Sequence, residues 1–235
     1  MANKTDMMSY LQRFLPVAEI VELSALDKDV AATLPEYWID VFSATEFEAR
    51  KTILLKEWSK FPYQLEATAK FLKDNLFDVD LIERAGEISM LYSIKNLGGK
   101  PVYYNGLNPK ELALTPKLQA IWNLLPADVT AFYENLHNGW FHYSSHATGY
   151  SSTQDMICLG DLEWGILEGM GTGALPFKLD DCISLFHNGA GGYVCFNLKE
   201  KDKKKGFIWW KGEAPELDEE LCPLIDEWTV IGLEE

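Results

Sequence analysis

The chain has 235 residues, 47% of them hydrophobic and 13% aromatic, which is enough apolar material for a packed core. Its formal net charge is -15 and its last arginine is Arg84, so direct binding to nucleic acid is disfavoured. We expect a cytoplasmic protein without a membrane segment. The first residues contain no signal-peptide core, and no stretch approaches the roughly 18 apolar residues of a membrane span.

The first 98 residues read as a helical region, because apolar residues recur there at steps of three and four. Pro16, Pro35 and Pro62 stand where a helix start or a turn tolerates a missing amide. The apolar runs are Phe47, Ile53, Leu54, Leu55 and Trp58; then Leu65, Ala69, Leu72 and Leu76; then Leu81, Ile82, Ala85, Ile88 and Leu91. We predict an amphipathic helix for each run.

The composition changes at residues 98–101, Gly-Gly-Lys-Pro, and we place a domain boundary there, with a second domain over residues 99–235. One clear helix follows, from Pro126 to Asn138-Gly139, with an apolar face of Val129, Phe132, Tyr133 and Leu136. Strands are predicted over residues 156–159, 182–186, 193–198 and 206–211, with the lysine-rich residues 199–205 as a hairpin loop. Residues 215–228 read as an acidic loop and a final helix. The expected fold class is α+β, with a twisted, mostly antiparallel sheet flanked by helices and a helical N-terminal extension.

The acidic charge is concentrated in the second domain. Residues 1–100 carry 12 basic and 16 acidic side chains, whereas residues 101–235 carry 9 and 20. Such an excess keeps a protein soluble, and it also suits the electrostatic capture of a basic protein. The sequence leaves both interpretations open.

Several groups of residues invite a chemical interpretation without completing one. His142 and His146 have the spacing of two ligands on a helix, but the segment lacks helical periodicity and the glutamate of a hydrolytic zinc motif. Ser144 and Ser145 lie near histidines without the glycine pattern of a nucleophile elbow. The four cysteines contain no CxxC pair. We expect no metal, no cofactor and no disulfide.

The segment from Trp140 to Asp181 is the predicted partner surface. It is rich in glycine, which suggests exposed loops, and it has no Lys or Arg between Trp140 and Phe177. Carboxylates beside a tryptophan would give steering charge and an anchor for a basic partner. The predicted contact residues are Asp161, Glu163, Trp164, Glu168, Asp180 and Asp181.

The order of motifs in residues 99–235 resembles the SUKH superfamily, which contains the fungal Smi/Knr cell-wall regulators and many bacterial immunity proteins. The matching pieces are Leu125-Pro126, Phe132-Tyr133, Asn138-Gly139, residues 183–186, Asn188-Gly189, residues 192–198, residues 206–210 and Glu227-Trp228. The helical residues 1–98 depart from the minimal domain of that superfamily.

The resemblance implies an α+β domain that has neither a cofactor nor catalytic residues. Bacterial members bind and neutralise polymorphic or secretion-system toxins, including type VI effectors, and these toxins are often nucleases. We therefore expect an immunity protein that occludes the active site of a cognate toxin, a basic secreted nuclease. A non-catalytic regulatory or scaffolding module of the same fold is the alternative, and a hydrolase using His142 or His146 is a third.

Overall fold

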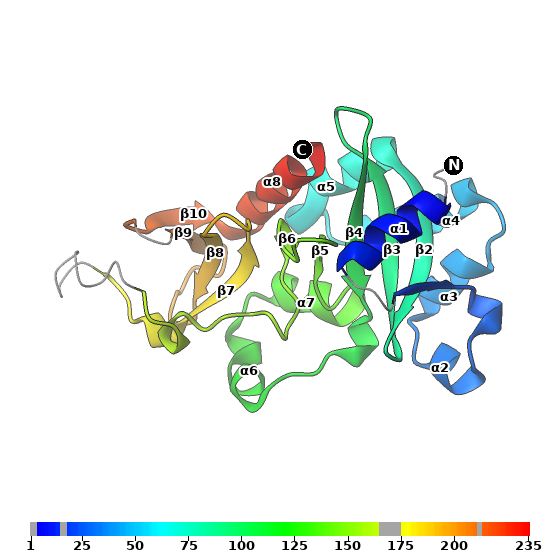
Figure 1. Cartoon of the computed structure of the whole chain (residues 1–235). Coiled ribbons are helices and arrows are strands. Elements are labelled where there is room, and N and C mark those ends of the chain that lie inside the picture. The colour runs from blue at the N-terminus through cyan, green and yellow to red at the C-terminus, as the bar shows by residue number, and fades with distance from the viewer. Residues whose placement is uncertain (1–3, 15–17, 165–174, 211–212) are drawn as a thin grey trace.

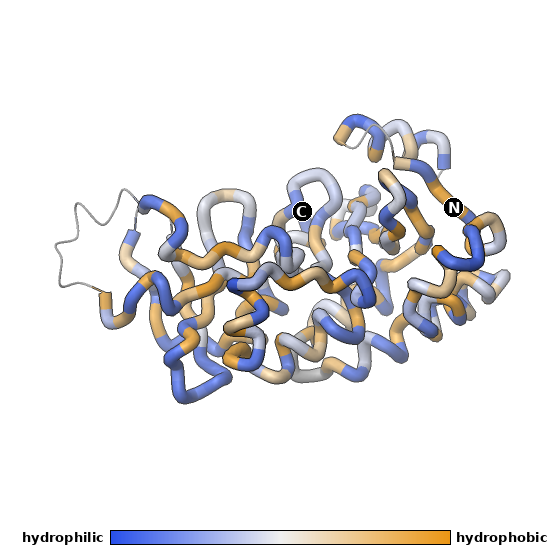
Figure 2. The backbone as a smooth tube through the Cα atoms, turned by 90° about the horizontal axis from the view of Figure 1, so that it is seen from below, coloured by the Kyte–Doolittle hydropathy of each residue, from blue (hydrophilic) through white to orange (hydrophobic). Residues whose placement is uncertain are grey.

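The computed structural model describes residues 4–14, 18–164, 175–210 and 213–235, without the side chains of residues 62–64. In this part of the chain ten strands form one antiparallel sheet, and their spatial order follows the chain from β1 to β10 (Figure 1). The predicted α+β class and antiparallel sheet are confirmed. The same elongated outline is seen from below in Figure 2.

Each strand pairs with the strand before it in the chain, and the long connections over residues 22–75 and 108–139 contain most of the helices. The strands are β1 (Glu19–Val21), β2 (Leu76–Arg84), β3 (Glu87–Lys95), β4 (Pro101–Leu107), β5 (Trp140–His142), β6 (Gly149–Tyr150), β7 (Cys182–His187), β8 (Gly192–Asn197), β9 (Lys205–Trp210) and β10 (Glu216–Glu220).

The α-helices are α1 (Lys4–Phe14), α2 (Lys28–Ala32), α3 (Glu36–Ser43), α4 (Phe47–Trp58), α5 (Pro62–Asn75), α6 (Pro116–Ile121), α7 (Ala127–Asn135) and α8 (Leu221–Glu234). In Figure 1 the helices α2, α3 and α4 lie beside the first strands, α5 and α8 lie above the sheet, and α6 and α7 lie below its middle. The short 3-10 helices are η1 (Leu23–Ala25), η2 (Pro109–Glu111), η3 (Trp122–Leu124), η4 (Leu159–Asp161) and η6 (Leu179–Asp181). Within the described ranges, no helix is both long and apolar enough to cross a bilayer.

One face of strands β2 to β5, called here the back face, packs against the helices through large aromatic rings. The Nε1 group of Trp58 on α4 donates to the Tyr92 hydroxyl over 3.1 Å, and the Trp58 ring lies edge-on to Trp140 at 4.9 Å. The Nε2 atom of His137 lies 2.6 Å from the same Tyr92 hydroxyl and shares a hydrogen bond with it. These side chains are buried, so this face is the main core of the molecule.

The opposite face of these strands, called here the front face, is covered only in part. Met7 and Leu11 of α1 pack on Ile82 and Leu91, and Tyr103 and Tyr143 complete this small cluster. Lys4 at the start of α1 lies 2.8 Å from the buried Asp80 carboxylate, which fixes the helix to β2. Beyond α1 the front face carries polar side chains and leaves a cavity.

Helix α8 links the two halves of the sheet. Its Asp226 carboxylate accepts hydrogen bonds from the backbone amides of Ala67 at 2.7 Å and Thr68 at 2.8 Å, where α5 restarts after the non-helical Leu65. Trp228 of the same helix lies 5.7 Å from the Phe186 ring on β7. A capping contact and an aromatic contact therefore hold both halves to one helix.

The helix predicted over Leu81 to Leu91 is wrong, because this segment forms most of the β2–β3 hairpin. Ala85 and Gly86 have φ angles of 53° and 88°, the positive values that a two-residue hairpin turn with a type I′ backbone requires. Ile82 and Leu91 on the front face are buried beneath α1, so they interrupt the alternation of polar and apolar side chains in these strands and give the apolar residues a helix-like spacing. The boundary predicted at residue 98 falls in the turn joining the paired strands β3 and β4.

Most of the other predicted helices and strands are confirmed, and two predictions near the second half of the sheet are wrong. The helices at α4, α5 and α7 are confirmed, as are strands β7, β8 and β9 with the lysine-rich hairpin between the last two. Residues 156–159 do not form the predicted strand: Cys158 makes a single bridge to Ile183, and η4 begins at Leu159. The acidic loop expected after Pro215 contains β10, whose partner is β9.

Candidate functional site

The predicted partner surface is built by two 3-10 turns that touch each other. Asp161 ends η4, and Asp180 and Asp181 end η6. A Cβ atom on Gly160 would lie 2.9 Å from the Asp180 backbone, so the glycine is what lets the turns approach so closely. Glu163 is exposed just after η4. Four of the six predicted contact residues are therefore carboxylates on or beside these two turns: Asp161, Glu163, Asp180 and Asp181.

Lysines from outside the segment reduce the charge of this surface. The Lys117 ammonium lies 2.6 and 2.7 Å from the two Asp161 carboxylate oxygens, and Lys199 lies 3.9 Å from Asp181. The wholly negative local field expected from the segment alone is therefore wrong, because folding places these lysines beside it. Glu163 and Asp180 have no ion-pair partner among the described residues.

Trp164 is not available as an exposed anchor, since only 7% of it is accessible. Its Nε1 group donates to the Leu159 carbonyl over 2.8 Å, and its ring meets Trp209 edge-on at 5.4 Å. The exposed apolar side chain here is Leu162, which is 45% accessible and lies between Asp161 and Glu163. Glu168 lies outside the described residues.

Of the histidines considered for catalysis or metal binding, His142 ends β5 and His146 lies in the turn between β5 and β6. The Nδ1 atom of His142 is 3.1 Å from the Ser145 hydroxyl and 3.3 Å from that of Ser144, and burial lowers the pKa of His142. His146 has a φ of 53° and stacks on Phe141 at 5.1 Å. In the part of the chain that the structure describes, no three His, Cys, Asp or Glu side chains are grouped as metal ligands.

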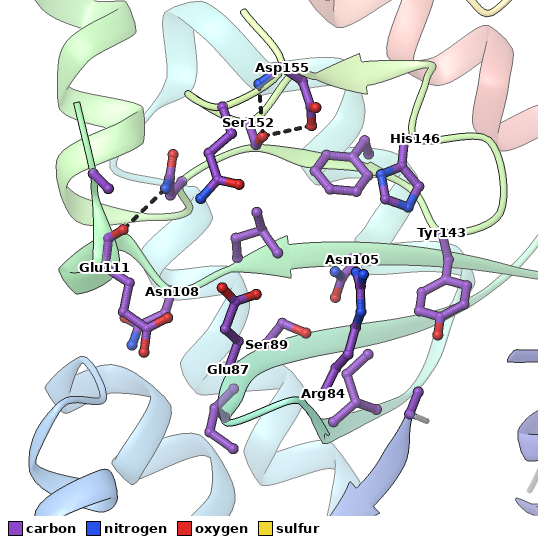
Figure 3. Close-up of a pocket in the computed structure, with 18 residues that line it drawn as sticks. Arg84, Glu87, Ser89, Asn105, Asn108, Glu111, Tyr143, His146, Ser152 and Asp155 are labelled. Atoms are coloured by element: carbon purple, nitrogen blue, oxygen red, sulfur yellow. Dashed lines mark hydrogen bonds between the residues drawn. The ribbon is translucent and has the colours of Figure 1, made fainter. Parts of the chain in front are cut away.

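A second candidate site, called here the front pocket, lies on the front face beside α1 and has a volume of about 300 Å³ (Figure 3). That volume is at the lower end of the range for small-ligand sites. Strand register places Ile82, Ser89 and Leu107 in one row and Asn105 beside Phe141 in the next, so these five side chains form its floor. The floor combines apolar surface with two buried polar groups, Ser89 and Asn105.

The charged groups of the front pocket come from separate elements. Arg84 and Glu87 face each other across the β2–β3 turn, Glu111 comes from η2, and Asp155 and His146 come from the long β5–β7 connections. In Figure 3 Arg84 lies beside Asn105 and near Tyr143, while Glu87 and Glu111 lie toward the other side. The pocket therefore has a cationic end and an anionic end.

The pKa values of Glu111 and Tyr143 are shifted by their surroundings in the front pocket. Partial burial raises the pKa of Glu111, a hydrogen bond from Asn108 lowers it, and the charge of Glu87 raises it further. Burial also raises the pKa of Tyr143 to about 12, against the opposing effect of the Arg84 charge. Two carboxylates thus repel each other at one end, and a guanidinium acts on the tyrosine at the other.

The sequence did not reveal the front pocket, because its residues are scattered from Ala18 to Asp155 and belong to no motif. Two weak signals existed. Arg84 is the last arginine of the chain, and Asn105 is a polar residue that directly follows the aromatic pair Tyr103-Tyr104. Comparisons with protein-family models, with curated proteins and with solved structures give no significant match for this chain.

Proposed function

We propose that this chain is a SUKH-like immunity protein that binds a cognate toxin in the cytoplasm and occludes its active site. The observation that carries the proposal is the surface of η4 and η6, where exposed carboxylates surround the exposed Leu162 side chain. An apolar contact within a charged rim is the usual arrangement of a protein interface.

The global charge supports a basic partner. The chain carries 36 acidic side chains against 21 lysines and arginines, so at least 15 carboxylates have no basic side chain to neutralise them. Nuclease toxins must hold phosphate groups and are commonly basic, so the two proteins would attract each other over about one Debye length of roughly 8 Å at physiological salt.

The proposal predicts that a gene beside this one encodes a small basic toxin domain, and the test uses that domain. Cells producing that domain should stop growing, and production of this chain should restore growth. The purified proteins should form a complex whose association slows as salt is added, because charge steers the encounter. Continued growth arrest with both proteins present, or a rate of association independent of salt, would contradict the proposal.

Three variants locate the interface. Glu163→Lys should slow association, whereas the matched reversal Asp74→Lys, on an exposed part of α5, should change it much less. Leu162→Ala should mainly speed dissociation, since it removes contact area and no charge. Wild-type kinetics for both Glu163→Lys and Leu162→Ala would move the interface to another surface.

A further inference from the structure

The front pocket contains a buried polar atom that the fold does not use. Asn105 is 7% exposed, and its Oδ1 atom has no hydrogen-bond partner among the described residues. A buried acceptor left unpaired destabilises the fold, and a donor group of a ligand at this position would remove that cost. Asn105 lines the pocket floor, and its Oδ1 atom lies just below the accessible surface, so a ligand meets it after a small rotation of the side-chain amide.

The charged groups around it are also unpaired within the fold. Arg84 and Glu87 are opposite residues of neighbouring strands, yet no ion pair within 4.0 Å joins them in the described structure. Glu111 likewise forms none. A guanidinium presents a planar set of donors that matches a carboxylate, and two nearby carboxylates favour a cation between or beside them.

We propose that the front pocket binds a small zwitterion of the α-amino acid class. Arg84 binds its carboxylate, and Glu87 together with the Asn105 carbonyl oxygen accepts hydrogen bonds from its ammonium group. Ile82, Leu107 and Phe141 provide the apolar surface for its side chain, which favours an aliphatic amino acid. This site is separate from the η4–η6 surface, and the proposal does not depend on the toxin.

The zwitterion is preferred to simpler ligands because of the charges at the rim. A carboxylate alone would meet Arg84 but would be repelled by Glu87, Glu111 and Asp155. A cation alone would leave the guanidinium without a partner. One molecule with both charges satisfies both ends of the pocket, and a volume of about 300 Å³ has room for it.

The experiment is calorimetry and thermal melting of the purified full chain with a panel of the standard L-amino acids. L-leucine is the reference probe, L-leucinamide lacks the carboxylate, and N-acetyl-L-leucine lacks the ammonium group. We expect saturable binding of an aliphatic amino acid, and a loss of about tenfold or more in affinity for each derivative, since each loses a charge-assisted hydrogen bond. Failure of every amino acid to bind at millimolar concentration would overturn the proposal, as would equal binding of the three leucine compounds.

Variants of the pocket test its assignment. Arg84→Gln and Glu87→Gln should each weaken binding about tenfold or more, and both sites are exposed, so the fold should be kept. Arg13→Gln removes the same charge from an exposed position of α1 and should bind as the wild type does. Unchanged affinity in Arg84→Gln would contradict the carboxylate site.

Asn105→Leu separates binding from folding. It replaces an unpaired amide by an apolar side chain of similar size, so the melting temperature should stay the same or rise while amino acid binding is lost. An asparagine with only a structural role would show a lower melting temperature in this variant. That result would overturn the role assigned to its carbonyl oxygen.

Discussion

The two halves of the sheet are built alike but bury different side chains. Strands β2 to β4 carry four buried polar residues on their front face, Asp80, Ser89, Ser93 and Asn105, whereas Ser184 is the buried polar residue in the described strands of the second half, β7 to β10. In that second half aromatic and aliphatic side chains fill both faces, and Trp164 closes one of them. A polar cavity therefore arises where a sheet face is left uncovered, whereas strands β7 to β9 are filled on both faces and leave the neighbouring turns as a surface for partners.

The largest effect on stability is expected from a cavity made in the second half of the sheet, where both faces are filled. Phe196 is fully buried on β8, so Phe196→Ala should lower the free energy of unfolding by about 3–5 kcal/mol, whereas Ser89→Ala in the pocket floor should cost below about 1 kcal/mol. Urea denaturation followed by circular dichroism measures both. Equal costs would break the distinction between the halves, and a wild-type midpoint for Phe196→Ala would contradict its place in the core.

A smaller effect is expected on the back face of the first half. A Cβ atom at Gly106 would lie 2.5 Å from the His137 ring, so Gly106→Ala should lower stability by about 1–3 kcal/mol through overpacking. Gly98→Ala is the control, because the nearest atom to its Cβ is 3.4 Å away. Thermal melting of the two variants should separate them. Equal melting temperatures would mean that the back face has room to repack.

The pH dependence of stability should show a third effect. Burial lowers the pKa of His137 to about 3, so only the unfolded chain takes up its proton as the pH falls below about 6.5. This contribution to stability is present above pH 6.5 and is lost toward the folded pKa, with a slope of up to about 1.4 kcal/mol per pH unit. His142 and His187, whose pKa values burial also lowers, add to the same trend.

The variant His137→Gln isolates that contribution. Between pH 6.5 and 5 its free energy of unfolding should fall less steeply than that of the wild type, by up to about 1.4 kcal/mol per pH unit, while the other histidines act equally in both proteins. Urea titrations at several pH values give the two slopes. Parallel slopes would show that His137 is protonated in the folded protein.

The smallest effect on stability is expected at the outer turns of the second half. Lys117 and Asp161 form a pair in which both side chains are about half exposed, 48% and 58%, so Lys117→Gln should change stability by less than about 1 kcal/mol. If the proposed toxin surface is right, the same variant should speed association with a basic toxin at low salt. A slower association would place this lysine, and not the carboxylates, in contact with the partner.

Local signals let the sequence specify the second half well. Charged and glycine-rich turns separate its strands, and the strands predicted over residues 182–186, 193–198 and 206–211 contain the buried positions Phe186, Val194, Phe196 and Ile208. The α7 helix was found for the same reason, because its capping residues and its apolar face lie within one short stretch. Of the acidic surface the sequence indicated the carboxylates, but it misassigned Trp164, whose burial depends on Trp209 and Tyr193 from other strands.

The sequence by itself thus determined the α+β class, the acidic character and those elements whose signals are local. Only the tertiary structure decided the rest. The β2–β3 hairpin resembled a helix in sequence because Ile82 and Leu91, which pack against α1, interrupt the alternation that marks a strand. The front pocket depends on strand register, which places Arg84, Glu87 and Asn105 on one face although Asn105 lies 21 positions from Arg84. Such a site arises from pairing between distant segments, and no local pattern of residues encodes it.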